Sequence, residues 1–409
     1  MTRPTGKEEV FVDVLVAGGG AAGLWLLESL LRSGYRAALL EARALGSGQT
    51  IGSQGILHGG FKYSFHRSAR GSAASVRSQT AVWDACLAGT GLPDLSGVVL
   101  RSPACHAWVV GRAGKILLMG AASLFRRPLA WAARDERPGA LRRASGVLRV
   151  EEVVIEPASF LESMARACAG HLFKVDVSAL DVETSAQGPD AVRIAASSSG
   201  RSLLFRARRL VLTAGEGNEA WRSRLGLTPV RMQRRPLHMV MCRGGSLPVL
   251  NGHQLGWHLR YPELTVTTTT DAAGRNVWQI GGRVAEVGAA WERRDVIEAS
   301  QALCRPLLGS AGRDLEWSSY RIDRAEGTTP GGRRPQGPTV FLEGPVVTAW
   351  PTKLVLVPEL VRMVSALLPE PEMPGSLPNG ADLGWPVPEI ARGPWEEATW
   401  SRGASAVSG

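Results

Sequence analysis

The clearest hydrophobic pattern of the chain lies in its first forty residues. The apolar, β-branched run at residues 11–17 (FVDVLVA) predicts a short buried strand, and residues 22–31 repeat apolar positions with helical spacing. Gly34 ends this helix, and residues 36–41 (RAALLE) predict a second strand. Together these elements predict a βαβ unit with a right-handed crossover.

Further along the chain, α/β patterns at both ends enclose a strand-rich middle part. Helical periodicity is found at residues 72–87, 156–169, 295–308 and after Lys353. Strand patterns occupy residues 97–110, 173–177, 191–195, 210–215, 237–242, 264–270, 277–280, 339–342 and 346–350. We therefore expect an α/β protein whose Rossmann-type nucleotide-binding domain is built from both ends of the chain and contains an inserted antiparallel-sheet domain.

The composition is that of an ordinary globular protein with an excess of positive charge. The chain has 409 residues, 44% of them hydrophobic, which excludes a disordered, collagen-like or coiled-coil protein. A formal net charge of +10 is typical of proteins that bind nucleic acid, anionic lipid or acidic substrates. However, only five of the 47 basic residues are lysines, and the arginines are spread along the whole chain. A GC-rich coding bias explains this pattern as well as any function does.

The cysteines and the apolar runs indicate a cytoplasmic protein without a transmembrane segment. The N-terminal sequence MTRPTGKEEV lacks the apolar core of a signal peptide. The longest candidate span, residues 354–368, is interrupted by Glu359 and Arg362 and is better interpreted as a buried helix. Five widely spaced cysteines without a CxxC motif predict reduced, structural thiols: Cys86, Cys105, Cys168, Cys242 and Cys304.

A dinucleotide-binding fingerprint joins the first strand to the first helix. Gly18, Gly20 and Gly23 form GxGxxG, and Glu41 ends the following strand. The helix N-terminus offers N–H groups and a positive dipole to a pyrophosphate, and Glu41 would accept hydrogen bonds from a ribose diol. A carboxylate at this position repels a 2′-phosphate, so NADP is disfavoured. The alternative is a glycine turn without a ligand.

The segment after Glu41 favours FAD over NAD. Residues 42–63 (ARALGSGQTIGSQGILHGGFKY) are rich in small and hydroxyl-bearing side chains, which suits a backbone that follows a large planar ring. An NAD dehydrogenase would continue with further short βα units. The sequence also lacks the second GxGxxG and the CxxC of pyridine-nucleotide-disulfide reductases. We therefore expect electrons to come from an organic substrate and to leave to oxygen or an electron carrier.

These motifs, in this order, resemble the FAD-dependent oxidoreductases of the D-amino-acid oxidase superfamily. That superfamily includes glycine oxidase, sarcosine oxidase, glycerol-3-phosphate dehydrogenase and 2-hydroxyglutarate oxidase. The resemblance covers most of the chain: GGGAAG with Glu41, GSGQTIGSQGILHGG, EPASFLESMARACA, VDV, LVLTAGEGN and AWPTKLVLVP. It implies that FAD contacts Gly18, Gly20, Ala22, Gly23, Glu41, Ala42, Gln49, Thr50, Ser53, Gln54, Gly55, Ile56, Val177, Ala214, Gly215, Thr352, Lys353 and Leu354.

The resemblance also implies a division into two domains. We expect the FAD-binding domain to comprise residues 1–90, 146–230 and 326–370. The inserted antiparallel-sheet substrate domain would comprise residues 91–145 and 231–325. Residues 371–409 would form a tail rich in Pro, Gly and Trp.

The turn before the last helix departs from the family pattern. Many members have a glycine-rich turn there, whereas this chain has Pro351, Thr352 and Lys353. By the resemblance, the amides of residues 352–354 and the Lys353 ammonium would stabilise negative charge at the flavin N1 and O2. The alternative is that Lys353 is a surface lysine at a helix N-terminus.

His58 is the candidate base, since oxidation of an alcohol requires removal of its O–H proton as the hydride leaves. The segment SQGILHGGFKY is similar to the IHGGxRY and IHAG elements of glycerol-3-phosphate dehydrogenases and 2-hydroxyglutarate oxidases, which oxidise hydroxyl groups of anionic substrates. It departs from them at Leu57 and Lys62. The alternative is a histidine that packs against the flavin ring or bonds to backbone.

Recognition of a substrate anion is expected from the segment WSSYRIDRAE, at residues 317–326. By the resemblance, Arg321 is the first choice and Arg324 the second, because a guanidinium binds a carboxylate or phosphate with two hydrogen bonds. Arg321 could instead belong to a structural ion pair with Asp323 or Glu326. Further pocket candidates are His253 and His258, which lie near Trp257 in the sequence, and Tyr261.

The sequence thus predicts an FAD-dependent oxidase or dehydrogenase that acts on a small anionic hydroxy acid or alcohol. The first alternative is a D-amino-acid or secondary-amine oxidase on the same scaffold. A basic flavoprotein that modifies RNA is a second alternative, but no RNA-binding module or interleaving of aromatic and basic residues supports a nucleic-acid partner. A flavin-binding protein without catalytic activity is the third.

Overall fold

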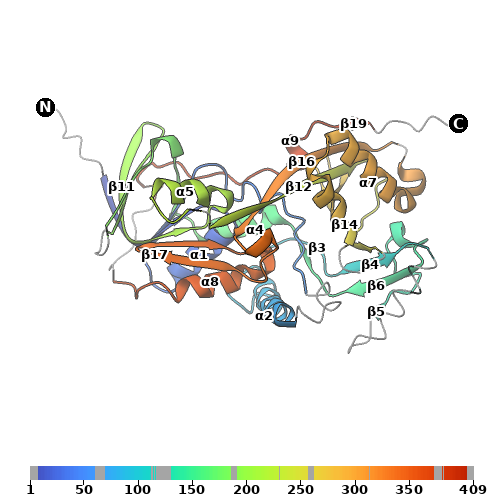
Figure 1. Cartoon of the computed structure of the whole chain (residues 1–409), viewed down its shortest axis with the longest axis horizontal. Coiled ribbons are helices and arrows are strands. Elements are labelled where there is room, and N and C mark those ends of the chain that lie inside the picture. The colour runs from blue at the N-terminus through green and yellow to red at the C-terminus, as the bar shows by residue number, and fades with distance from the viewer. Residues whose placement is uncertain are drawn as a thin grey trace.

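The structure is a computed structural model with two lobes, and long strands run from one lobe into the other (Figure 1). It describes residues 8–59, 70–111, 114, 116, 130–185, 191–229, 231–256, 262–312, 314–372, 380 and 382–402.

The first lobe is built on a mostly parallel sheet with the order β17-β18-β11-β1-β2-β8. Its central strand β1 is parallel to β2 and to β11, and β11 is parallel to β18. The strands are β1 (Glu8–Ala17), β2 (Ala37–Glu41), β8 (Leu172–Lys174), β11 (Arg201–Leu212), β17 (Thr339–Glu343) and β18 (Val346–Trp350). The antiparallel strands β9 (Asp181–Thr184) and β10 (Val192–Ser198) extend from β11.

Helices cover the first sheet because their apolar faces bury its side chains. Trp25, Trp83 and Phe160 join three of these helices in one core cluster with β1 and β2. The helices on this side are α1 (Ala21–Arg32), α2 (Arg70–Leu87), α4 (Pro157–Ala167) and α8 (Val357–Ser365), while α5 (Asn218–Arg224) lies near a second cluster. Short 3-10 turns are η3 (Gly139–Leu141), η4 (Val177–Ala179), η5 (Gly215–Gly217), η6 (Gly288–Ala290), η7 (Gly309–Gly312), η8 (Pro330–Gly332) and η9 (Leu354–Leu356).

The second lobe contains a nine-stranded sheet with the order β19-β16-β12-β15-β14-β13-β4-β6-β5. All of its pairings are antiparallel except that between β13 and β4. The strands are β4 (Cys105–Val109), β5 (Ala130–Trp131), β6 (Gly146–Val150), β12 (Met232–Arg243), β13 (Gly252–Leu255), β14 (Pro262–Thr270), β15 (Asn276–Gly281), β16 (Glu316–Gly327) and β19 (Ser401–Arg402). Helices α6 (Arg283–Val287), α7 (Arg293–Leu308) and α9 (Pro394–Glu397) and the strand pair β3 (Leu100–Ser102) and β7 (Val154–Ile155) complete the fold.

This architecture is the predicted one, with a few differences in detail. The strand predicted at residues 173–177 ends at Lys174, because Asp176 accepts hydrogen bonds from the amide and hydroxyl of Ser178 and starts η4. The predicted division after residue 145 assigns β6 to the first domain, whereas β6 pairs with β4 and β5 in the second sheet. The segment expected to be a tail contributes β19, which pairs with β16.

The cysteines and the helices can be compared directly with the expectations. All five cysteines are buried and none forms a disulfide. Over the part of the chain that the structure describes, no helix combines the length and the apolar composition that a membrane crossing needs.

Candidate active site

A cavity of about 2000 Å³ lies where the two sheets meet. Its walls come from the ends of β1, β11 and β18, from the segment after β2, and from β12, β14 and β16. This volume exceeds the 300–1,000 Å³ of typical ligand pockets, which leaves room for a ligand larger than a drug-sized molecule. The walls include the predicted residues Gly18, Gly20, Ala22, Glu41, Ala42, Gln49, Thr50, Ser53, Gln54, Gly55, Ile56, His58, Val177, Ala214, Gly215, Arg321, Arg324, Thr352, Lys353 and Leu354.

Gly23 is absent from the cavity wall because it serves the packing behind the fingerprint. A Cβ atom at Gly23 would lie 1.9 Å from the Gly18 carbonyl oxygen and 2.7 Å from Thr213 Oγ1. Gly18 has a φ of +107°, and a Cβ there would lie 2.4 Å from Ala214 Cα. The absence of these Cβ atoms lets α1 start directly against β1 and β11, with its N-terminus at the cavity.

The carboxylate of Glu41 is held in place by backbone amides. Glu41 Oε2 accepts a hydrogen bond from the Gly19 amide (2.7 Å), and Oε1 accepts one from the Arg43 amide (2.7 Å). Each carboxylate oxygen can accept a second hydrogen bond, so a ribose diol can still be bound. The Ala21 amide donates to Thr50 Oγ1 (3.1 Å), which fixes the segment after β2 over the first turn of α1.

This segment is also tied to the second sheet. Gln54 Nε2 donates to the carbonyls of Thr265 (3.0 Å) and Gln279 (2.9 Å), and Tyr320 Oη donates to the Gly52 carbonyl (2.8 Å). Burial raises the pKa of Tyr320 more than a hydrogen bond from Gln279 and the charge of Arg101 lower it, so the phenol stays neutral. The hydrogen bonds from Gln54 and Tyr320 hold the segment after β2 against the second sheet.

The turn before the last helix adopts a strained conformation. Thr352 has a φ of +64°, and its hydroxyl donates to the Gly337 carbonyl (3.0 Å). A β-branched residue in this left-handed region costs roughly 1–2 kcal/mol, which glycine would avoid. The Lys353 amide donates to the Pro351 carbonyl (2.7 Å), so one of the three amides predicted to face the flavin is already used within the turn.

His58 contacts a buried carboxylate that sequence reasoning did not single out. His58 Nδ1 lies 3.4 Å from Glu152 Oε2, and the Gly59 amide donates to Glu152 Oε1 (3.1 Å). His253 Nε2 lies 3.0 Å from the same Oε2, and its Nδ1 lies 3.0 Å from Thr265 Oγ1. Glu152 and His253 are fully buried, whereas 28% of the His58 side chain is exposed, toward the cavity.

The charge of Glu152 follows from these contacts. Burial favours the neutral acid, but positive charge on His58 and the hydrogen bonds with His253 and His58 outweigh burial and lower the pKa of Glu152. The carboxylate is therefore ionised at neutral pH and acts only as an acceptor.

The two candidate arginines differ in their surroundings. Arg321 donates to the carbonyls of Ala289 and Trp291, so its guanidinium is bound to backbone. Arg324 lies three residues further along the same strand and therefore belongs to the opposite face. On that face the register pairs Tyr320 with Met239, Ile322 with Leu237 and Arg324 with Arg235.

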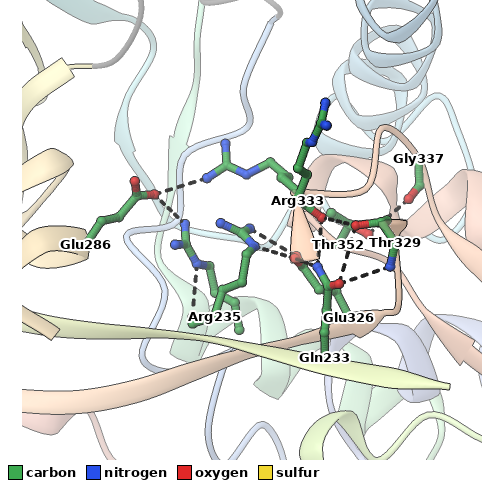
Figure 2. A network of polar contacts seen from close by, with 10 residues as sticks. Gln233, Arg235, Glu286, Glu326, Thr329, Arg333, Gly337 and Thr352 are labelled. Atoms are coloured by element: carbon green, nitrogen blue, oxygen red, sulfur yellow. Dashed lines mark hydrogen bonds and ion pairs between the residues drawn. The ribbon is translucent and has the colours of Figure 1, made fainter. Parts of the chain in front are cut away.

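Arg324 belongs to a network of arginines and carboxylates that borders the cavity. Figure 2 shows its members Arg235, Glu286 and Glu326. Arg324 and Arg334 both contact Glu286 Oε1, at 2.9 and 3.4 Å, and Arg235 pairs with Glu326 through both carboxylate oxygens. Burial, followed by the charge of Arg235, lowers the pKa of Arg324 to about 10, against the opposing effect of Glu286. Three guanidinium groups face two carboxylates, so this part of the cavity favours an anion.

Some residues named from the sequence lie outside the described part of the chain, and the cavity residues Glu152 and Arg235 were not predicted. Lys62, Trp257, His258 and Tyr261 lie outside the described residues. Glu152 follows a second glutamate in a short acidic stretch, and Arg235 lies in an arginine-rich run, so neither had a distinguishing signal. Their positions depend on contacts between distant segments.

The chain is similar to known flavoproteins over nearly its whole length. A family model described as "DAO: FAD dependent oxidoreductase" matches residues 13–346. A probable FAD-dependent oxidoreductase from Pseudomonas aeruginosa, PA4991, is 36% identical over 396 residues, which are 94% of this chain and 98% of the relative. The crystal structure of the FAD-dependent oxidoreductase PA4991 has a TM-score of 0.77 with 33% identity and covers 97% of this chain and 99% of its own.

More distant structures share the fold alone. Glycine oxidase from Geobacillus kaustophilus has a TM-score of 0.61 at 16% identity, covering 90% of this chain and 96% of its own. A dithionite-reduced L-α-glycerophosphate oxidase from Mycoplasma pneumoniae with FAD bound also has a TM-score of 0.61, at 14% identity, covering 91% and 98%.

Proposed function

This chain belongs to the DAO family of FAD-dependent oxidoreductases, and on that premise we propose that it oxidises a C–H bond of a small anionic hydroxy acid or alcohol. FAD, when bound, supplies the acceptor for the hydride that leaves the substrate carbon. The electrons would then pass to oxygen or to an electron carrier.

The residues that would hold FAD line the cavity, apart from Gly23. Gly18 and Gly20 at the start of α1 would bind the pyrophosphate, and Glu41 the ribose. The adenine would lie near Ala42, Val177 and the turn at Ala214 and Gly215. Gln49, Thr50, Ser53, Gln54, Gly55 and Ile56 would line the flavin ring, and Thr352, Lys353 and Leu354 its pyrimidine end.

The observation that carries the proposal is the contact between His58 and ionised Glu152. In its neutral form, His58 can donate a hydrogen bond to the Glu152 carboxylate only from Nδ1–H. Nε2 then carries the lone pair that the proposed base requires. As the hydride leaves the carbon, Nε2 would take the hydroxyl proton and the substrate would become a carbonyl compound. A neutral amine needs no such base, which favours hydroxyl oxidation over amine oxidation.

The arginine network supports an anionic substrate. Arg324 and Arg334 border the cavity with an excess of positive charge, as does Arg321 at its edge. In a partly desolvated site this charge attracts a carboxylate or phosphate more strongly than on an open surface. We infer that Arg324 contributes more than Arg321, since the Arg321 guanidinium is already bound to two carbonyls.

The test is anaerobic flavin reduction with 2-hydroxy acids, glycerol 3-phosphate, glycine, sarcosine and D-amino acids. We expect a hydroxyl substrate to bleach the flavin. His58→Gln should slow that reduction by about 100-fold or more, the usual contribution of a general base, while FAD stays bound. His106→Gln, which changes a histidine outside the cavity wall, is the matched control. Reduction only by amines, or a near-normal rate in His58→Gln, contradicts the proposal.

A further inference from the structure

We propose that His58, Glu152 and His253 form a binding site for a divalent transition-metal cation such as Zn²⁺, which opens on the cavity. Metal binding itself does not depend on the proposed function, whereas the effect of the bound metal on catalysis rests on it.

The three ligand atoms already have spacings near those of a metal site. Glu152 Oε2 lies 3.0 Å from His253 Nε2 and 3.4 Å from His58 Nδ1, and all three atoms lie within 4.8 Å of one another. Bonds of 2.0–2.1 Å in a tetrahedral zinc site place neighbouring ligand atoms about 3.3 Å apart. The two spacings to Glu152 therefore fit. A small rotation of the partly exposed His58 ring would bring the third, between His58 Nδ1 and His253 Nε2, into range.

The ligands come from three separate segments and have their own supporting contacts. His58 lies in the segment after β2, Glu152 lies between β6 and β7, and His253 lies on β13. The second ring nitrogen of His253 contacts Thr265 Oγ1, and the second oxygen of Glu152 accepts from the Gly59 amide. Metal-binding imidazoles and carboxylates are usually oriented by such outer contacts.

The open side of the cluster faces the cavity. Glu152 and His253 are buried, and His58 borders the cavity with 28% of its side chain exposed. Three protein ligands with a fourth position open to a cavity are the arrangement of zinc sites that exchange a water or ligand. Two imidazoles and one carboxylate select transition metals over Mg²⁺ and Ca²⁺, which prefer oxygen ligands.

Metal binding changes the hydrogens at the two ring nitrogens. His58 Nδ1 and His253 Nε2 both lie against Glu152 Oε2. Each nitrogen must present its lone pair to the cation, so as the metal ion enters, a hydrogen on that nitrogen moves to the other ring nitrogen or leaves to solvent.

Metal binding would block the base that the proposed function assigns. A neutral imidazole bound through Nδ1 carries its hydrogen on Nε2, so His58 could no longer accept a substrate proton. Zn²⁺ would thus inhibit flavin reduction by substrate, and a chelator would restore it.

The experiment is equilibrium dialysis of the EDTA-treated holoenzyme against Zn²⁺, with metal analysis and without substrate. We expect one Zn²⁺ per chain and no competition from millimolar Mg²⁺. His253→Gln and Glu152→Gln should each weaken binding by more than tenfold. Thr265→Val, which removes only an outer contact, should weaken it by about tenfold. His106→Gln, a histidine on the neighbouring strand β4, should leave it unchanged.

Two results would overturn the proposal: the unmodified protein binds no Zn²⁺, or His253→Gln binds Zn²⁺ with unchanged affinity. The three residues would then form a hydrogen-bonded cluster only. If His253→Gln no longer binds FAD or shows no melting transition, the variant is misfolded and its Zn²⁺ affinity is not informative. The X-ray absorption spectrum of Zn²⁺ bound to the unmodified protein then identifies the ligand atoms. Nitrogen and oxygen ligands are expected, and sulfur ligands overturn the proposal. Because no substrate is present, failure of the proposed oxidation does not affect these results.

Discussion

At the scale of single residues, Gly18 and Gly23 of the fingerprint have different roles. Gly18 needs a positive φ and a close approach to Ala214, and it borders the cavity. Gly23 lies behind the cavity, where its missing Cβ lets α1 pack on the Gly18 carbonyl and Thr213. The motif is therefore partly a ligand site and partly a packing requirement.

Gly23→Ala tests this packing. The added Cβ would overlap rigid backbone at Gly18, so we expect the free energy of unfolding to fall by about 1–3 kcal/mol and FAD to be retained poorly. Thermal melting and the flavin absorbance of the purified protein measure both effects. At Gly139 an added Cβ meets no atom within 4 Å, so Gly139→Ala is the control. Normal FAD content and melting in Gly23→Ala contradict the close packing.

At the scale of elements, the turn between β14 and β15 is held by one carboxylate. Asp271 accepts hydrogen bonds from the amides of Ala273 (3.1 Å) and Arg275 (2.9 Å) and pairs with the Arg275 guanidinium. Burial raises the pKa of Asp271, but these contacts with Arg275 and Ala273 outweigh it and lower the pKa below its usual value. The turn should therefore be most stable while the carboxylate is ionised.

This lowered pKa gives a defined pH dependence. The stabilisation is present above the unfolded pKa of about 3.9 and is lost as the pH falls through the lower folded value. Asp271→Asn should lower the free energy of unfolding by about 1 kcal/mol at pH 7, and the difference from the unmodified protein should shrink as the pH falls below about 4. Urea unfolding at several pH values measures it, with the exposed Asp295→Asn as control. A constant difference would contradict this role.

The paired strands β12 and β16 present a graded surface to the cavity. Their cross-strand pairs change from Met239 and Tyr320, whose hydroxyl donates to the Gly52 carbonyl, to Arg235 and Arg324 at the other end. Burial, followed by the charge of Arg235, disfavours the charged form of Arg324 and lowers its pKa. An anion that binds at the arginine end should stabilise the fold, because it compensates the positive charge there.

We expect inorganic phosphate to raise the melting temperature relative to chloride at the same ionic strength. Arg324→Met should lose most of this increase. Arg234→Met should keep it, because Arg234 lies on the opposite face of β12 in partly exposed ion pairs with Glu216, Glu219 and Asp323. An equal phosphate effect in both variants would show that phosphate acts elsewhere.

At the scale of the whole molecule, the two lobes share structure. β12 and β16 extend from one lobe into the other, and β16 also contacts β17 and β18 of the first sheet (Figure 1). The cavity lies where the sheets meet, and both contribute to its wall. A ligand in this cavity therefore stabilises both lobes together.

FAD should accordingly stabilise the molecule as a unit. At a free FAD concentration of 100 times the dissociation constant, binding adds about 2.7 kcal/mol to the free energy of unfolding. We expect the holoenzyme to melt in one calorimetric transition, the apoprotein to melt at a lower temperature, and added FAD to reverse the shift. Two separate transitions in the holoenzyme would show that the lobes unfold independently.

Features that depend on local sequence patterns could be predicted before the fold was known. Hydrophobic periodicity fixed the βαβ unit and most element positions, and glycine spacing with Glu41 indicated the dinucleotide. Together with the motif order, these gave the family, the fold class and FAD, which the comparisons confirm. Such signals are readable because each lies within about thirty consecutive residues.

The contacts between side chains in the cavity depend on the three-dimensional fold and could not be predicted from local patterns. Glu152 reaches His58 across 94 positions of sequence and His253 across 101, so no local pattern marks it. The register of β12 and β16 placed Arg324 beside Arg235, while strand alternation turned Arg321 to the opposite face. Long-range pairing sets these contacts because burial and hydrogen bonding, rather than sequence distance, determine where a charged side chain is stable.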